Sequence, residues 1–435
     1  MKRLSITLTA ILSLTAVMAG EADSSASPRQ LTLDECRELA IKNNAKVSVA
    51  AGNAEAAEEL RKEAFTKYFP TVTASGMAFA ANKPVVDLDI FNIATLQMIK
   101  RGVSANVMAV QPVFAGGRIV NGNRLAEVGV EASELERQNA VDDVTLTTEK
   151  YYWQLVTLKS KRRTLEDVIA LVDTLEYQVG VALKAGVTTR NELLKVQLRR
   201  NELRSTMVDL DNGIALSQQL LAQYVGLDGE KVDIAEADVP DDVPPYPSDI
   251  YIDPNAALGA TTDYRLLQKK VKAAELEEKI AVGENLPTVG VGAGYFYDDI
   301  ISQKHGFGAV FVSVSVPISA WWGGSHAIKR RKIESANARA EMDDLSQMLC
   351  IKMINAWDDL TSAHRKMEIA KESIAQSKEN LRMNENFFLA GVSNVTDLLD
   401  AQTLYRQSLD QYTEAYGAYR VARASYLQAT NQEQI

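Results

Sequence analysis

The chain has 435 residues, of which 46% are apolar and 24% charged, so it is long and apolar enough to bury a sizeable core. Its formal net charge is −10, which argues against nucleic acid as a partner. After the first twenty residues no run of eighteen apolar residues occurs, and the sequence therefore offers no transmembrane helix. Any crossing of a membrane would have to be made by strands.

Residues 1–20 have the features of a secretory signal peptide. Two basic residues precede an apolar stretch that runs to Met18, and Ala19 and Gly20 are small residues at which a peptidase can cut. The first cysteine, Cys36, lies too far from this stretch to be a lipid-modified N-terminal residue. We therefore expect cleavage and export from the cytoplasm.

The mature chain contains two copies of one unit. Residues 185–197 (AGVTTRNELLKVQ) and 390–402 (AGVSNVTDLLDAQ) are identical at six of 13 positions, at an offset of 205. The sequence FPTV at 69–72 likewise corresponds to LPTV at 286–289. A shared order of such landmarks indicates duplication. The expected organisation is a signal peptide at 1–20, a first repeat at 21–226, an acidic, proline-rich linker or equatorial subdomain at 227–253, a second repeat at 254–428 and a tail at 429–435.

Each copy is expected to have the same order of elements. A helix (Leu33 to Tyr68, or Pro254 to Glu284) runs toward a proline, which disfavours its continuation. Two strands follow, then a glycine pair, Gly116–Gly117 or Gly323–Gly324, and then about seventy residues of helix. Such a helix would be about 100 Å long at about 1.5 Å per residue, far longer than helices in globular proteins.

Strands are expected at about 71–80, 103–112, 288–297 and 308–316. In the second repeat, apolar residues alternate with small or polar ones, as in VGVGAGYFY at 289–297. This alternation is typical of membrane barrel strands, and a half-buried soluble hairpin is the alternative. Four strands are too few to close a barrel, and lipid offers no partner to an open edge. Several chains must then share one barrel. Three copies would give twelve strands, although the sequence alone does not fix three.

The helices carry a second periodic pattern. In the last helix Tyr405, Tyr412, Tyr419 and Tyr426 recur every seven residues. A period of seven corresponds to about 3.5 residues per turn and predicts coiled-coil packing between long antiparallel helices. An aromatic ligand site is the alternative interpretation of these tyrosines.

Both long helical segments break at the sequence Ala-Gly-Val. Glycine suits the left-handed turn that ends one helix and lets the next run back. This predicts two helical hairpins with exposed tips at 185–188 and 390–393. After the second tip, Asp397 and Asp400 share one helix face near its N-terminus, where they could simply complement the helix dipole. The tip residues are Ala185, Gly186, Val187, Ala390, Gly391 and Val392.

Taken in order, the signal peptide, the FP or LP before the strands, the glycine pairs and the AGV tips followed by ELL or DLL resemble the TolC-like outer-membrane efflux protein family. The resemblance covers essentially the whole mature chain. It implies a mainly α fold with a membrane β-barrel part: a homotrimer whose twelve-strand barrel continues into a long α-helical coiled-coil tunnel through the periplasm. It also implies a periplasmic adaptor protein at the tips and an inner-membrane pump of RND, ABC or MFS type.

The resemblance also assigns an aperture. The family's aperture aspartates correspond to Asp397 and Asp400, which would form a ring of six carboxylates in a trimer and favour cations. Glu192 is the counterpart in the first repeat and is expected on the outer hairpin. The sequence departs from some relatives at Ser393 and Asn394, where a basic residue would hold the closed tip by a salt bridge.

The function implied is a passive exit duct in the outer membrane of a two-membrane bacterium, for efflux or type I secretion. No enzyme is indicated, because no GxSxG, HExxH or GxxxxGK motif occurs and the three histidines lack metal-ligand spacing. No cofactor and no metal are expected. Cys36 and Cys350 follow no metal or redox spacing, and a disulfide between them stays open. A secreted or periplasmic coiled-coil scaffold or adhesin without a channel is the alternative function.

Overall fold

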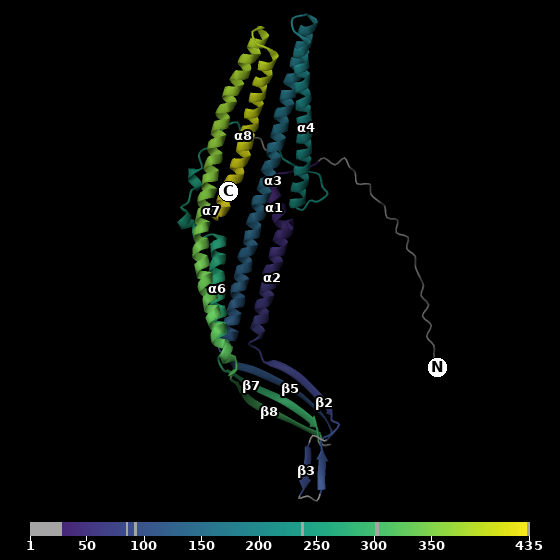
Figure 1. The fold of residues 1–435 in the computed structure, drawn as a ribbon, viewed down its shortest axis with the longest axis vertical. Coiled ribbons are helices and arrows are strands. Elements are labelled where there is room, and N and C mark those ends of the chain that lie inside the picture. Colours follow the sequence, from purple (N-terminus) through teal and green to yellow (C-terminus); the bar gives the residue numbers. More distant parts are fainter. Residues whose placement is uncertain (1–27, 84–85, 91–93, 236–238, 301–303, 433–435) are drawn as a thin grey trace, which may run out of the picture.

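The computed structural model describes residues 28–83, 86–90, 94–235, 239–300 and 304–432. The expected signal peptide at 1–20 and the last three residues of the expected tail lie outside the described residues. The molecule is elongated, with a curved sheet at one end and two helical hairpins at the other (Figure 1). No helix in the described ranges is both long and apolar enough to cross a membrane.

The main sheet has four antiparallel strands in the order β2 (Thr71–Ala80), β5 (Arg101–Phe114), β7 (Thr288–Asp299) and β8 (Lys304–Ser315). The pairing of β5 with β7 joins the two halves of the chain, with an irregularity between Pro112 and Phe114. A second hairpin, β3 (Val86–Ile90) with β4 (Ala94–Met98), was not among the expected strands. Within the described residues β2 and β8 each pair on one side only, so both long edges of the sheet are open.

A row of helices continues the sheet. Next to the sheet, α2 (Ala45–Thr66) packs on α3 (Arg118–Lys184), α3 on α6 (Thr262–Glu284), and α6 on α7 (Ala320–Leu389). These helices are joined to β2, β5, β7 and β8 respectively, and therefore stand in the same order as the strands. Strands and helices thus form one continuous wall (Figure 1).

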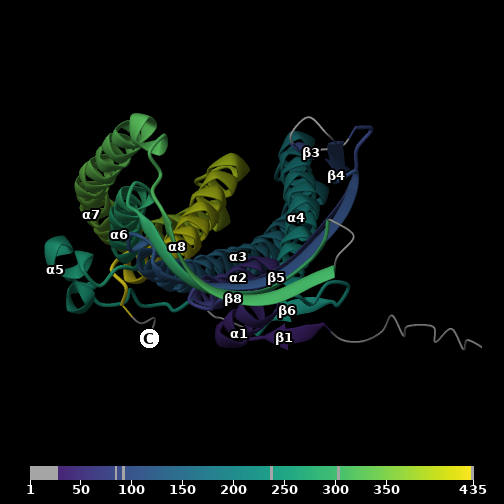
Figure 2. The ribbon, with the colours of Figure 1, turned by 90° about the horizontal axis from the view of Figure 1, so that it is seen from below.

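Farther from the sheet the row becomes α4 (Arg190–Tyr224), α3, α8 (Val395–Ala429) and α7. The 67-residue α3 and the 70-residue α7 run through both rows. Viewed along the long axis, the wall is an arc, with α1 (Leu33–Asn43) and the small strands β1 (Arg29–Leu31) and β6 (Val232–Ile234) on its convex side (Figure 2). A short helical turn at Ser248–Ile250 and α5 (Pro254–Leu258) complete the described elements.

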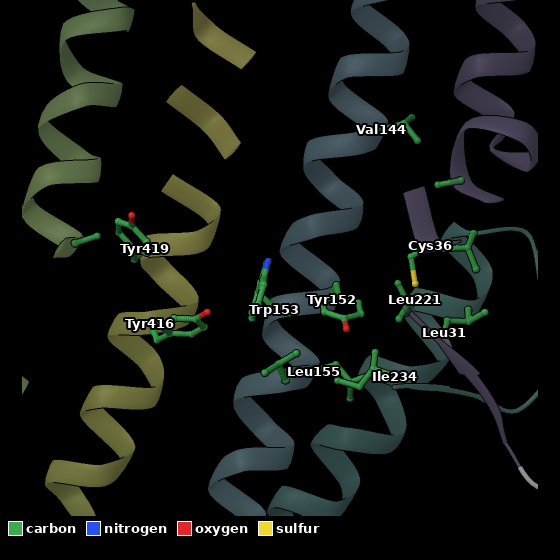
Figure 3. Close-up of a cluster of buried hydrophobic side chains, with 14 of the residues drawn as sticks. Leu31, Cys36, Val144, Tyr152, Trp153, Leu155, Leu221, Ile234, Tyr416 and Tyr419 are labelled. Carbon is green, nitrogen blue, oxygen red and sulfur yellow. The ribbon is translucent and has the colours of Figure 1, made fainter. Parts of the chain in front are cut away.

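The core lies where α3 passes between α1 and α8. Neighbouring residues of α3 project to opposite sides: Trp153 toward Tyr416 of α8, with ring centroids 5.6 Å apart, and Tyr152 toward Cys36 of α1 (Figure 3). Cys36 is fully buried, and burial raises the pKa of its thiol to about 12. Both Cys36 and Cys350 are free thiols.

The buried tyrosines of α8 also hold the linker. Tyr412 Oη donates to Pro240 O at 2.8 Å, and Tyr426 Oη accepts from the backbone N–H of Ile252 at 2.9 Å. Two of the four tyrosines spaced by seven thus bind the linker, whereas Tyr405 packs against the core cluster near the tips and Tyr419 packs against His364 of α7.

Two of the expected helices are divided. The helix expected from Leu33 to Tyr68 breaks at Asn44, whose backbone is extended and whose side chain caps α2 by accepting from Lys46 N. The Asn44 amide nitrogen also donates to Tyr224 O at 3.1 Å, so the break lets this side chain bind the end of α4. The helix expected from Pro254 likewise stops at Leu258 and restarts after Thr261, which caps α6.

The two glycine pairs have different roles. Gly116 and Gly117 have φ of 62° and 77° and form the turn from β5 into α3. A Cβ at Gly116 would lie 2.3 Å from the backbone oxygen of Gly283, so α6 and this turn touch through glycine backbones. Gly323 and Gly324 instead lie inside α7, and only Gly324 is needed for close packing, against Asn285. The expectation that both pairs precede their long helix is wrong for the second pair.

Candidate functional site

The two hairpin tips are built in the same way. At the first tip, Gly186 has φ of 73° and the N–H of Val187 donates to Ala182 O at 2.9 Å. At the second, Gly391 has φ of 72° and Val392 N–H donates to Phe387 O, also at 2.9 Å. This bond pattern satisfies the last helical carbonyls and turns the chain back sharply. Each Ala-Gly-Val sequence thus forms the turn between the two helices of a hairpin.

The tips expose apolar side chains. Val187 is 80% exposed and Val392 is 78% exposed, and Leu389 beside the second tip is almost as open. Exposed apolar residues gathered at the end of a molecule are candidates for a contact with another protein.

Asp397 is part of the local structure of the second tip. Its backbone N–H donates to Asn394 Oδ1 at 3.0 Å, and its carboxylate accepts from Ser393 Oγ at 2.9 Å and from Asn394 N at 3.4 Å. Asn394 and Asp397 form a capping box at the start of α8. The carboxylate is nevertheless exposed, so it caps the helix and also carries a negative charge at the surface.

Asp400 follows almost one turn later on α8 and is exposed. Within the part of the chain that the structure describes, no hydrogen bond or ion pair involves its carboxylate. The two aspartates therefore share a helix face, but only Asp397 is tied into the tip.

Glu192 occupies the equivalent position on α4 and has a different environment. One carboxylate oxygen pairs with Lys195 Nζ at 2.9 Å, and the other is buried with no partner among the described residues. Lys195 thus neutralises Glu192, so this acid does not present a free charge as Asp397 does.

Two basic residues of α4 cross to α8. Lys195 Nζ donates to Thr396 Oγ1 at 3.0 Å, and Arg199 donates to Thr403 Oγ1 at 2.7 Å. These contacts tie the first hairpin to the second, immediately beside the aspartates. The spacing of Lys195 and Arg199, four residues apart, puts both on one helix face and was the one feature of the sequence that could have indicated a shared contact. Nothing in the sequence pairs them with threonines 201 and 204 residues later.

The described residues contain no group of three His, Cys, Asp or Glu side chains that could hold a metal ion. His364 is buried, and its Nε2 lies 2.8 Å from Pro244 O, so it helps to anchor the linker on α7. Of the predicted site residues, Asp397 and Asp400 therefore lie on α8 beside Lys195 and Arg199 of α4, which the sequence had not placed there.

Comparisons with known proteins identify similar outer membrane efflux proteins. The sequence model of a family described as "Outer membrane efflux protein" matches residues 36–227 and again 254–432. The outer membrane efflux protein BepC of Brucella suis biovar 1 (strain 1330) is 22% identical over 367 residues, which cover 83% of this chain and 77% of BepC.

Solved structures agree in fold. The outer membrane protein VceC of Vibrio cholerae superposes with a TM-score of 0.77 at 13% identity, covering 92% of this chain and 96% of VceC. The CmeC outer membrane channel of Campylobacter jejuni superposes with a TM-score of 0.76 at 14% identity, covering 99% of this chain and 94% of CmeC.

Proposed function

Because the chain belongs to the outer membrane efflux protein family, we propose that three copies form a passive exit duct for substrates delivered by an inner-membrane pump through a periplasmic adaptor. The protein is accordingly an outer membrane efflux protein, and its family consists of transport channels, not enzymes. The family match to both halves of the chain supports the internal duplication.

The observation that supports the proposal most strongly is that the wall formed by one chain has open edges. One chain forms an arc whose sheet has open edges at β2 and β8. Because the sheet has four strands that alternate in direction, β8 of one copy would run antiparallel to β2 of the next, and identical copies can repeat without breaking the alternation. Closure would remove both edges, which lipid cannot satisfy. Twelve strands in three copies would suit a membrane barrel.

The aperture is proposed at the second tip. In a ring of three copies Asp397 and Asp400 would supply six carboxylates, and like charges in a constriction attract cations. The exposed valines of the tips, Val187 and Val392, are proposed to contact the adaptor. Glu192 is proposed to hold Lys195 in position and not to line the aperture with a free negative charge, because the two side chains form an ion pair.

The test is conductance in a planar lipid bilayer. The Asp397→Asn, Asp400→Asn double variant keeps hydrogen-bonding groups at both positions but removes both charges, and the ratio of cation to anion permeability should fall. Asp209→Asn removes an exposed carboxylate elsewhere, on α4, and should leave the ratio unchanged. An unaltered ratio in the double variant would reject the aperture assignment.

Fractionation separates the duct from the scaffold or adhesin. A duct should be recovered from detergent-extracted outer membrane as an oligomer that heat converts to single chains. Recovery of free single chains in the periplasm or medium would favour the scaffold.

A further inference from the structure

The two lateral edges of the wall meet the sheet at the same level. On one edge α2 ends at Thr66, just before β2, and on the other α7 begins at Ala320, just after β8. If β8 of one copy lies beside β2 of the next, the start of α7 must stand beside the end of the next copy's α2, and the two helices run in opposite directions.

The third residue of α7, Trp322, lies on the free edge. The opposite face of α7 is fixed by its contacts with α6, because Gly324 packs on Asn285 and Arg331 pairs with Glu277 at 2.6 Å. Trp322 is two residues from Gly324, about 200° around the helix, and is 82% exposed. An indole left almost wholly open is costly in water and suits a buried contact.

The next copy's α2 offers a receiving surface. A groove of about 750 Å³ opens beside α2 and α3 at the level of the sheet, lined among others by Leu60, Ala64, Phe69 and Ile119. Glu63 also lines the groove and lies sixteen residues from Val47, the one buried residue of α2, and so about 160° around the helix. The groove therefore reaches the free side of α2.

The two edges also match farther from the sheet. Ile333, on the same face of α7 as Trp322, is 51% exposed, and it stands at the height of Gly52, beside which a Cβ would meet no atom within 4 Å. Between these levels Lys329 on α7 has no ion-pair partner in the described ranges, and the free side of α2 carries Glu59, which pairs within its own helix with Lys62 at 2.8 Å. An apolar side chain thus faces an open glycine, and a cation faces an acid.

We propose that neighbouring copies are joined by this lateral contact, in which Trp322 of one copy enters the groove beside α2 of the next and Ile333 packs over Gly52. The inference rests on the proposed ring of copies but goes beyond it, because it names the residues that hold the helical walls together. Three such contacts would surround the base of the tunnel.

Disulfide cross-linking tests the contact in the full-length protein in outer membranes. In a Cys36→Ala, Cys350→Ser background, Trp322→Cys with Glu63→Cys, which lies at the same height on α2, should give covalently linked dimers and trimers on oxidation, since a disulfide needs Cα atoms about 4.4–6.8 Å apart. The pair Ile333→Cys with Gly52→Cys keeps Trp322 and should give the same ladder. Ile333→Cys with Ala54→Cys is the control, because Ala54 is two residues from Gly52 but faces α3, and it should not cross-link.

Native electrophoresis without oxidant tests the ring of copies and the lateral contact separately. Trimers that form but are linked by neither edge pair would overturn the lateral contact and leave the duct intact. Brominated lipid that quenches tryptophan fluorescence less in a Trp322→Phe variant than in the unsubstituted protein would identify lipid as the neighbour of Trp322 and overturn the contact as well. Single chains in every variant, including the unsubstituted background, would overturn the duct itself.

Charge reversal gives an independent readout. Lys329→Glu should lower the temperature at which the trimer dissociates in detergent, and adding Glu59→Lys together with Lys62→Glu, which keeps the ion pair within α2, should restore it. Failure of the second change to restore the temperature would contradict the charge pairing.

Discussion

At the scale of single residues, glycines fix how the sheet is attached to the helices. Gly116 has φ of 62° and its backbone touches that of Gly283, where a Cβ would come 2.4 Å from Gly116 O. A side chain at Gly116 would meet both a left-handed backbone and a backbone atom that cannot move aside. Gly323, by contrast, lies in α7 with open space around it.

Gly116→Ala should therefore lower the free energy of unfolding by more than the roughly 1–2 kcal/mol that left-handed backbone alone costs. Gly323→Ala should raise it by about 0.5–1 kcal/mol, since alanine is favoured over glycine within a helix. Denaturant unfolding of the detergent-extracted protein measures both. Equal effects of the two substitutions would show that the junction tolerates a side chain.

The two aspartates near the second tip should also differ in how much each contributes to stability. Asp397→Ala should cost about 1 kcal/mol of stability because it removes one partner of the capping box. Asp400→Ala removes no hydrogen bond within the described residues and should leave stability within about 0.5 kcal/mol. Thermal unfolding of both variants distinguishes a helix cap from a free surface charge, and equal losses would contradict this division.

At the scale of elements, polar contacts tie α4 to α8 near the tips. Lys195 and Arg199 each donate to a threonine of α8. A hydrogen bond from a charged donor contributes about 1.5–3 kcal/mol. Two such bonds would be enough to hold the hairpins together until a partner separates them.

The Lys195→Met, Arg199→Met double variant should accordingly increase the conductance of the isolated channel, because both crossing bonds are lost while the side-chain length is kept. Arg204→Met is the matched control, because Arg204 lies on the same helix and forms a 4.0 Å ion pair with Asp173 of α3. Bilayer recordings that show no difference between the two variants would exclude these bonds as restraints on opening.

A second contact between elements predicts a pH dependence. Burial of Asp233 in β6 would by itself raise the pKa of its carboxyl, but hydrogen bonds from Lys159 of α3 and from Ile234 N lower it below the ordinary value of 3.8. A lowered pKa in the folded state stabilises the protein above the unfolded pKa, and this stability is lost as pH falls through the folded value.

Asp233→Asn should thus lower the free energy of unfolding by about 1.5–3 kcal/mol near pH 7. The difference from the unsubstituted protein should shrink below the ordinary carboxyl pKa of 3.8. Denaturant titrations at several pH values give the comparison, and a difference that persists undiminished at low pH would mean that the ionised carboxylate is not the source.

At the scale of the whole molecule, the outer-membrane efflux family and location expected from the motifs are confirmed by the family match. The sequence could reveal this much because duplication, strand alternation and glycine turns are local or periodic signals. The division of the first helix at Asn44 escaped prediction because it depends on a contact with Tyr224, 180 residues away. For the same reason the threonine partners of Lys195 and Arg199 could not be found before folding.

The matched order of strands and helices has a geometric consequence for the proposed barrel. Four strands and four helices span the same arc in each copy, yet strands lie about 4.8 Å apart and packed helices about 9 Å apart. Equal widths require the strands to lean about 60° from the duct axis, more than the roughly 35–45° of common membrane barrels. A strand of 12 residues, such as β7 or β8, then rises only about 20 Å across the bilayer. The strands are therefore long because a wide helical tunnel tilts them strongly, so each strand needs more residues to rise a given height through the membrane.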